Sequence, residues 1–380
     1  MRLHEYEAKE LFKKYGIPVP EGKVVFSSEE AAEVAKEIGL PVVIKAQVLV
    51  GGRGKTGGVK FARNLKEVEE ISGEMLEVDI KGYKVEGVLI EKRVNIQKEL
   101  YLGVTIEGSA GKPVVIVSSE GGVEIEETAR NYPQRIFSLQ VDVFKGLRSY
   151  EARLLAKKLG LKGEKLLKVG NILYKLGNLY RDYDALIVEI NPLVVTREGE
   201  VFAADAVLQV DDSSLFRHPE LQAKAIERIP DELEREAKKV GVTYVNLDGD
   251  IGLICSGAGL GMATMDMIRR KAKPANFLET GGGMTKELMA GALRVVMKKK
   301  NIRAVFINIY GGINPIHEGA KGIVEAIKED KIKIPIVAKA LGNRQEETWD
   351  ILEEGGVKVV KESQTAKAVE ELFKVLKERE

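Results

Sequence analysis

The hydrophobic pattern divides the chain into two halves of different style. From Val245 onward, short apolar runs alternate regularly with segments of helical periodicity. Such an alternation is typical of a doubly wound parallel sheet, so this half is expected to have an α/β fold. The predicted strands are 250–255, 275–278, 304–310, 334–338 and 357–360.

The first half carries many strand patterns and few helices, which predicts α+β layers. Helix starts are well marked, for instance by Ser27 with Glu30 as a capping box. The charged stretch 230–236 reads as a helical linker, after which the style changes. We therefore expect two domains, 1–236 and 237–380. The predicted strands of the first are 22–26, 41–46, 85–93, 100–107 and 113–118, followed by a hairpin.

That hairpin carries the first candidate site. The apolar stretches 185–188 and 193–195 are predicted to form one strand and 201–207 the next, and a loop with glycine at Gly199 connects them. A three-residue loop of this kind sets a register in which Asn191 lies opposite Asp205. Opposed side chains are about 5 Å apart at Cβ, close enough to share one hard cation through oxygen. The alternative is a pair of polar residues beside a turn on a solvated face.

Glu189 shares the face of this pair through the two-residue strand period. The ligands offered are a carboxylate and an amide, without Cys or His nearby, so Mg²⁺ fits better than zinc. Such a sparse site is usually completed by nucleotide phosphates and water.

A glycine-rich loop is the second candidate. Lys45 ends an apolar strand, and the segment 51–58 that follows combines glycine with positive charge. Two more glycines follow its Gly-Lys-Thr, so it does not lead into a helix as a P-loop does. We interpret it as a lid over phosphates, with Lys45, Arg53 and the amides of Gly52 and Gly54 as contacts. The alternative is a flexible surface loop with incidental basic residues.

Glycines also follow three predicted strands of the second half, at 257–259, 281–283 and 311–312. In open parallel sheets, ligands bind at the carboxyl ends of strands, where glycine lets backbone amides reach phosphate. This predicts a phosphate-bearing ligand in the second half as well.

Composition narrows the function classes. The chain of 380 residues is 44% hydrophobic and 31% charged, with a net charge of +1. This balance gives no field for nucleic acid or an anionic membrane, so neither is expected as a partner. A single cysteine, Cys255, fits a reducing compartment. The first residues form an amphipathic helix rather than a signal peptide, and no apolar run is long enough to cross a bilayer, so we expect a cytoplasmic protein.

Together these residues resemble the β subunit family of succinate–CoA ligase. The motifs span essentially the whole chain: Leu-His-Glu-Tyr-Glu-Ala-Lys at its start, Gly-Gly-Arg-Gly-Lys-Thr-Gly-Gly-Val, Lys-Glu-Leu-Tyr-Leu-Gly, Glu-Gly-Gly-Val-Glu-Ile-Glu, Glu-Ile-Asn-Pro-Leu-Val, Gly-Ala-Gly-Leu, Pro-Ala-Asn-Phe-Leu and Asn-Ile-Tyr-Gly-Gly-Ile. The resemblance implies an ATP-grasp fold followed by a flavodoxin-like CoA-ligase domain. It implies ATP or ADP as substrate, although the sequence does not decide between adenine and guanine nucleotides.

The resemblance also implies roles for single residues. Asn191 and Asp205 correspond to magnesium ligands, and Glu189 to the acid that steadies a phosphohistidine. That histidine belongs to an α subunit, which also makes most contacts to CoA, so the chain is expected to be half of an enzyme that interconverts succinate, CoA and ATP with succinyl-CoA, ADP and phosphate. The implied nucleotide contacts are Lys45, Gly52, Arg53, Gly54, Glu91, Val94 and Glu99.

The chain departs from the family pattern at positions that are expected to contact the carboxylic acid substrate. Ser256 stands where the family usually has Asn, and Asn314 replaces part of the commoner run after Gly312 and Ile313. These four residues are the predicted contacts to the acid and phosphate in the second domain. The sequence therefore leaves open a ligase for malate or another acid. It also leaves open a self-contained ATP-grasp ligase that joins a carboxylate to an amine, and a nucleotide-binding subunit without chemistry.

Overall fold

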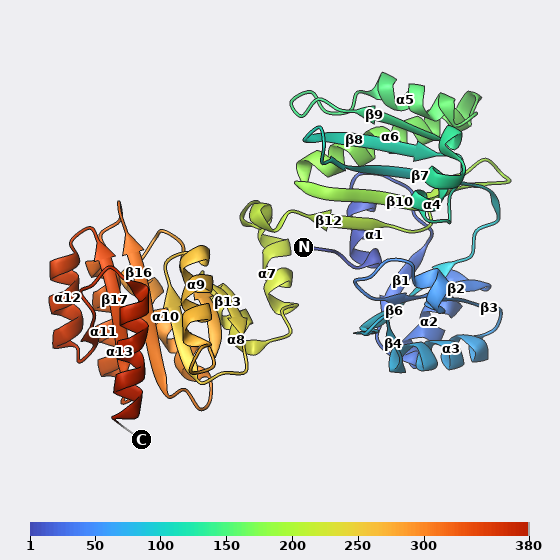
Figure 1. Ribbon diagram of the computed structural model, residues 1–380. Helices are drawn as coiled ribbons and strands as arrows, with labels where there is room; N and C mark the ends of the chain where they lie inside the picture. The colour runs from blue at the N-terminus through green and yellow to red at the C-terminus, as the bar shows by residue number, and fades with distance from the viewer. Residues whose placement is uncertain (379–380) are drawn as a thin grey trace. The chain divides into compact units, whose positions relative to one another are not determined.

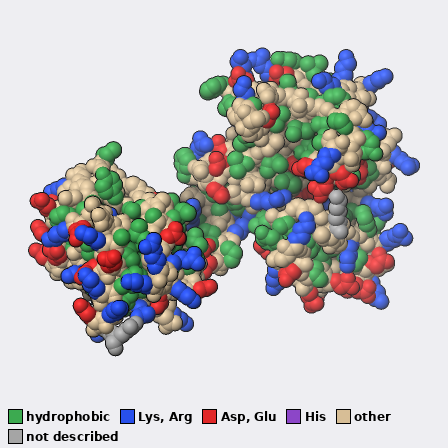
Figure 2. All heavy atoms as spheres, in the orientation of Figure 1, with side chains coloured by type: hydrophobic (Ala, Val, Ile, Leu, Met, Phe, Trp, Pro, Cys, Tyr) green, Lys and Arg blue, Asp and Glu red, His purple; other side chains and the backbone are tan. Residues whose placement is uncertain are grey.

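The computed structural model describes residues 1–378 and, within them, every side chain except that of Lys55. The chain forms two compact units, Met1–Leu221 and Gln222–Glu380. Charged side chains of both signs are spread over the visible face of each unit (Figure 2), as the near-zero net charge requires. Among the described residues, no helix is long and apolar enough to span a membrane.

Unit 1 begins with a small antiparallel sheet in the strand order β1-β6-β2-β3, covered by helices α2 and α3 (Figure 1). Side chains such as Val34, Ile44, Val68 and Ile90 form its core. A short 3-10 turn, Arg53–Thr56, connects β2 to β3, and a small hairpin follows α3. The bounds are β1 Gly22–Val25, α2 Ser28–Ile38, β2 Val42–Gln47, β3 Val59–Ala62, α3 Leu65–Glu77, β4 Asp79–Ile80, β5 Tyr83–Lys84 and β6 Gly87–Lys92.

The second sheet of unit 1 has the order β11-β10-β7-β8-β9, and β12 also pairs with β10. Helices α5 and α6 pack against each other, and α6 packs on β10, so one face of the sheet is covered. The N-terminal helix α1 packs against β12 of this sheet. The bounds are α1 Glu5–Lys14, β7 Ile96–Glu107, β8 Lys112–Ser118, α4 Ile125–Asn131, β9 Ile136–Gln140, α5 Ser149–Lys158, α6 Gly163–Asp182, β10 Ala185–Thr196, β11 Val201–Ala203 and β12 Val207–Val210.

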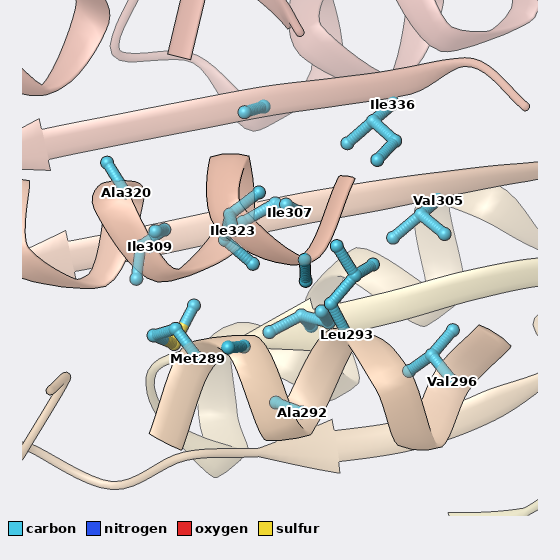
Figure 3. Packing of buried hydrophobic residues seen from close by; sticks show 14 of the residues in the cluster. Met289, Ala292, Leu293, Val296, Val305, Ile307, Ile309, Ala320, Ile323 and Ile336 are labelled. Atoms are coloured by element: carbon cyan, nitrogen blue, oxygen red, sulfur yellow. The ribbon is translucent and has the colours of Figure 1, made fainter. Parts of the chain in front are cut away.

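Unit 2 contains one sheet in the order β13-β15-β14-β16-β17-β18. All neighbouring pairs are parallel except β13 with β15. One apolar cluster lies under α10 and α11, where Leu293, Ile307 and Ile323 interlock (Figure 3), and a second lies under α9 and α13. The bounds are α8 Glu232–Val240, β13 Thr243–Asn246, β14 Ile251–Cys255, α9 Ala258–Ile268, β15 Asn276–Glu279, α10 Lys286–Lys298, β16 Ala304–Gly311, α11 His317–Glu329, β17 Ile336–Gly342, α12 Gln345–Glu354, β18 Lys358–Val359 and α13 Thr365–Lys377.

Helices on both faces of a mostly parallel sheet confirm the doubly wound prediction for the second half. The five strands predicted from the alternation are all present, and the antiparallel edge strand β13 was not predicted. The stretch expected to be a linker begins α8, which packs against β13 and α10 and buries Ala237 in the core of unit 2. The compact units divide at Leu221, before α8, whereas the sequence pattern placed the change of style near residue 236.

Candidate nucleotide and phosphate site

A cavity of about 1120 Å³ lies within unit 1 between its two sheets. Both sheets and the glycine loop contribute side chains to its walls. It brings together nine residues singled out in the sequence: Lys45, Gly52, Arg53, Gly54, Glu91, Val94, Glu189, Asn191 and Asp205. Its volume is in the range of cavities that hold a small-molecule ligand or cofactor.

Glu99 is the one predicted nucleotide contact that does not line this cavity. It lies on β7, and a Cβ placed on Gly122 would be 2.8 Å from its Oε2 atom. Gly122 does line the cavity and has a φ of 73°, which favours glycine. Glu99 therefore lies beside Gly122 at the cavity wall without lining the cavity itself.

Lys45 is held in a buried ion network. Its Nζ atom lies 2.9 Å from Glu5 Oε1 and 2.7 Å from Glu91 Oε2. Lys9 binds the same two carboxylates, at 2.7 Å from Glu5 and 2.5 Å from Glu91. Burial lowers the pKa of Lys45, but Glu5 and Glu91 outweigh that effect and raise it above the ordinary lysine value. Lys45 is therefore a fixed positive charge at the cavity wall.

Arg53 ties the glycine loop to the same network. Its guanidinium nitrogen NH2 lies 2.8 Å from Glu5 Oε2 and 2.8 Å from Asp205 Oδ1, while NH1 donates to the Ala46 carbonyl. Burial acts to raise the pKa of Glu5, but the cations of Lys45, Lys9 and Arg53 hold it well below its usual range. Glu5 is thus the central anion that fixes these cations in place.

Glu5 and Lys9 were not predicted as site residues. They are one helical turn apart on α1, on the stripe that continues to the buried Phe12. A charged pair on the apolar stripe of an amphipathic helix is a signal that could have identified them. The sequence pattern predicted an amphipathic helix here, but this pair was not considered.

The hairpin has the predicted register. Leu193 pairs with Ala203 on one side and Glu189 with Val207 on the other, in the same alignment that opposes Asn191 to Asp205. The strand predicted from Val201 is nevertheless interrupted, because residues 204–206 leave the ladder between β11 and β12. Asp205 therefore lies in a bend at the cavity wall, with 34% of its side chain exposed.

The polar groups of the hairpin have different environments. Asn191 Oδ1 accepts from the Gly122 amide at 2.8 Å and its Nδ2 donates to the Val123 carbonyl at 3.0 Å. Burial and the neighbouring Glu5 raise the pKa of Asp205, although Arg53 opposes them. Burial also raises the pKa of Glu189, to about 7, although its hydrogen bond with Asn191 acts in the other direction. Glu189 is therefore partly protonated near neutral pH.

The other four predicted residues lie in unit 2, at the carboxyl ends of β14 and β16. Ser256 Oγ accepts from the Tyr310 amide at 2.9 Å and thus links the two strand ends. Asn314 Nδ2 donates to the Gly282 carbonyl, and Asn343 donates to the carbonyl of Ile313 at 2.9 Å. The Ile313 side chain is 91% exposed. Ser256, Ile313 and Asn314 are therefore each tied into the loops at this edge, next to Gly312.

The two units match two domain families. The ATP-grasp domain family matches residues 2–195, and the CoA-ligase family matches residues 254–373. The structure of an ATP citrate lyase from Methanothrix soehngenii, in complex with citrate and coenzyme A, has the same fold, with a TM-score of 0.71 over 98% of this chain and 99% of that chain, at 21% identity. The class is thus an ATP-grasp domain joined to a CoA-ligase domain, which confirms the expected fold.

Similar proteins identify the family within that class. A β subunit of ADP-forming succinate–CoA ligase from Ignicoccus hospitalis is 47% identical over 94% of this chain and 95% of its own length. The corresponding subunit from Aquifex aeolicus is 47% identical over 95% of both chains. A GDP-forming one from Thermus thermophilus is 46% identical over 93% of both. The chain belongs to the family of succinate–CoA ligase β subunits.

Proposed function

We propose that this chain binds the nucleotide for a succinate–CoA ligase and works with an α subunit that carries a phosphorylated histidine. The observation that carries this proposal is one cavity of unit 1, which combines two buried cations, Lys45 and Arg53, with the polar side chains of Glu189, Asn191 and Asp205. Positioning and charge neutralisation are what phosphoryl transfer chiefly requires from a protein. The names of the family's members support the same assignment.

Lys45 and Arg53 neutralise the nucleotide phosphates in this proposal. Arg53 lies in the turn between two glycines, so its loop brings a guanidinium and backbone amides to the same ligand. Glu91, Val94 and the amides of Gly52 and Gly54 complete the nucleotide contacts in the cavity. Glu99, which lies beside Gly122, is included in the proposal as a further nucleotide contact. ATP and GTP both remain candidates, because the relatives include ADP-forming and GDP-forming enzymes.

Asn191 and Asp205 would hold Mg²⁺ through their side-chain oxygens. The fit is supported by their shared hairpin register and by the exposure of Asp205 to the cavity. Arg53 and the Ala206 amide both contact Oδ1 of Asp205. When bound, Mg²⁺ would neutralise charge on the phosphates.

Glu189 faces the phosphoryl acceptor. The imidazole nitrogen of the α-subunit histidine attacks the γ-phosphorus, the bond to the bridging oxygen of ADP breaks, and the opposite ring N–H donates to the Glu189 carboxylate. The phosphoryl group then passes to a succinate carboxylate to give succinyl phosphate. The CoA thiol then attacks the acyl carbon, the bond from that carbon to the phosphate oxygen breaks, and the departing phosphate takes up the thiol proton. All steps are reversible.

The second candidate is a ligase of the same mechanism that takes a different acid. Ser256 and Asn314 favour it, because both are engaged with loops at the carboxyl edge of the unit 2 sheet where the acid is expected to bind. A hydroxyl at Ser256 is shorter than the amide that is usual in the family. A larger or hydroxylated dicarboxylate therefore deserves a test beside succinate.

The test is reconstitution of the chain with its α subunit. With ATP, Mg²⁺, CoA and succinate we expect formation of a thioester and a labelled histidine on the α subunit. Formation with malate but not succinate would support the second candidate. Acid-dependent ATP turnover by the chain alone would favour a self-contained ligase instead. Loss of all thioester formation with every acid tested, although nucleotide still binds, would favour a subunit without chemistry.

A further inference from the structure

Glu189 has a neighbour across the sheet that the proposed mechanism does not use. On β7, Gly103 pairs directly with Glu189 of β10. Tyr101 lies two residues along β7, on the same face as Gly103 and Glu189. Its hydroxyl lies over Gly103 and therefore faces Glu189 across the two strands. Tyr101 is only 4% exposed, and it is not one of the residues that line the cavity.

Gly103 makes this contact possible. A Cβ placed on Gly103 would be 2.6 Å from the Tyr101 hydroxyl oxygen and 3.0 Å from Cζ. The phenol therefore lies across the surface of Gly103 and reaches the side chain opposite. The φ of Gly103 is not positive, so the backbone does not require glycine there. The space taken by the Tyr101 ring is the reason that a side chain is excluded.

The hydroxyl acts as a donor. Burial raises the pKa of Tyr101, and the negative charges of Glu189 and Glu126 raise it further. A phenol in this environment keeps its proton and is available to donate a hydrogen bond to the carboxylate that it faces. Because the phenol is packed in the sheet, the donor has a fixed position. A carboxylate held on one side in this way presents its other oxygen in a defined direction.

We propose that Tyr101 is a positioning residue that orients Glu189 toward the phosphoryl acceptor, and that Gly103 is needed to leave room for its phenol. This inference rests on the proposed function, since Glu189 must first have a partner to meet. Tyr101 touches neither the nucleotide nor the reacting atoms in this arrangement. Its removal should therefore affect the transfer step and not the binding of ATP.

The experiment uses the complex of this chain with its α subunit and measures single-turnover phosphorylation from labelled ATP. Tyr101→Phe should lower the transfer rate roughly ten- to hundredfold, as loss of a supporting hydrogen bond typically does. The KM for ATP should stay within about twofold of wild type, because the nucleotide contacts are unchanged. Gly103→Ala should lower the rate in the same direction, although alanine by itself favours a strand over glycine.

A matched control is Tyr244→Phe in unit 2. Tyr244 is also a buried tyrosine, at 6% exposure, but its hydroxyl has no hydrogen-bond partner in the described structure. This substitution removes the same atom without removing a contact to a carboxylate. The transfer rate should not change.

A double-mutant cycle with Glu189→Gln gives the decisive comparison. If Tyr101 acts through Glu189, then Tyr101→Phe should slow transfer little in the Glu189→Gln background. An unchanged rate for Tyr101→Phe, or an equal loss in both backgrounds, would overturn the inference. Hydrogen exchange of β7 and β10 in the isolated chain tests the contact between the two side chains separately. If Tyr101→Phe and Glu189→Gln change the exchange rates of these strands in a strictly additive way, the inference is also overturned. A wild-type complex that phosphorylates no histidine would instead reject the proposed function.

Discussion

Two buried lysines, one in each unit, show how the surroundings decide whether a buried charge is stable. Lys45 in unit 1 is 8% exposed and contacts Glu5 and Glu91. Lys339 in unit 2 is 4% exposed, and its one hydrogen-bond partner in the described structure is Asn308 Oδ1, at 3.4 Å. Burial acts against the charge of both. The carboxylates raise the pKa of Lys45 above the ordinary value, whereas burial lowers the pKa of Lys339.

The difference between the two lysines reflects a polar cavity in unit 1 and an apolar core in unit 2. The cavity of unit 1 contains an ion network of three cations and three carboxylates, which keeps Lys45 and Arg53 charged and fixed before any phosphate arrives. The interior of unit 2 is apolar around Lys339, with Cys255 and the amide of Asn308 nearby. An anion that entered the cavity of unit 1 would therefore meet cations that are already paired with carboxylates.

The largest expected effect comes from removing the paired lysine. Lys45→Met leaves Glu5 and Glu91 buried with one cation fewer, and breaking a buried pair in this way costs about 3–5 kcal/mol. Hydrogen exchange of peptides from α1 and β2 should show faster opening of this region. Lys23→Met, at an exposed position on β1, is the control and should leave the exchange unchanged. Equal protection in the two variants would show that the network adds nothing to the stability of unit 1.

The opposite sign is expected for the unpaired lysine. Lys339→Met removes a buried amine that has no carboxylate partner among the described residues, and replaces it with an apolar chain of similar length. The free energy of unfolding should rise by roughly 1 kcal/mol, the order of the cost of a poorly paired buried polar group. The single tryptophan, Trp349 of α12, reports on unit 2 because its Nε1 atom donates to the Ala340 carbonyl of β17. A lower urea midpoint by Trp349 fluorescence would contradict this expectation.

The same contrast explains which parts of the molecule were predictable from the sequence. The strands of unit 2 were found because each is a short apolar run with its own helix beside it. The edge strand β13 was missed, since only Tyr244 of its four residues is buried and no alternation can be read. The hairpin register followed from a loop of known length, whereas the break at residues 204–206 depends on contacts outside the hairpin.

The ion network could not be derived from local patterns. Glu5 meets Lys45, 40 residues away, and Lys9 meets the Ala204 carbonyl, 195 residues away. Nothing in the sequence near either residue signals these partners. The cavity residues Lys45, Arg53 and Asp205 were identifiable, because glycine and polar residues stood out against strand patterns. The residues that hold them in place, Glu5 and Lys9, sit on an ordinary amphipathic helix.

A smaller effect should appear in the pH dependence of unit 2. The folded state lowers the pKa of Lys339 below the ordinary 10.5, so the unfolded chain binds more protons in the alkaline range. The stability of unit 2 should therefore rise as the pH increases toward 10.5. Urea unfolding followed by Trp349 between pH 7 and pH 10, with Lys339→Met as the reference, isolates this contribution. If both proteins show the same slope, Lys339 does not titrate differently in the folded state.

An exposed lysine completes the comparison and should give the smallest effect. Lys374 on α13 lies 3.0 Å from Glu371, one turn earlier, but its side chain is 68% exposed. Water and salt screen such a pair, and two mobile side chains must be ordered to form it. Lys374→Met should therefore leave the Trp349 unfolding midpoint unchanged at moderate ionic strength. If Lys374→Met lowered the stability as much as Lys45→Met, the presence of a carboxylate partner would decide how much a lysine stabilises this fold. Burial of the pair would then make no difference.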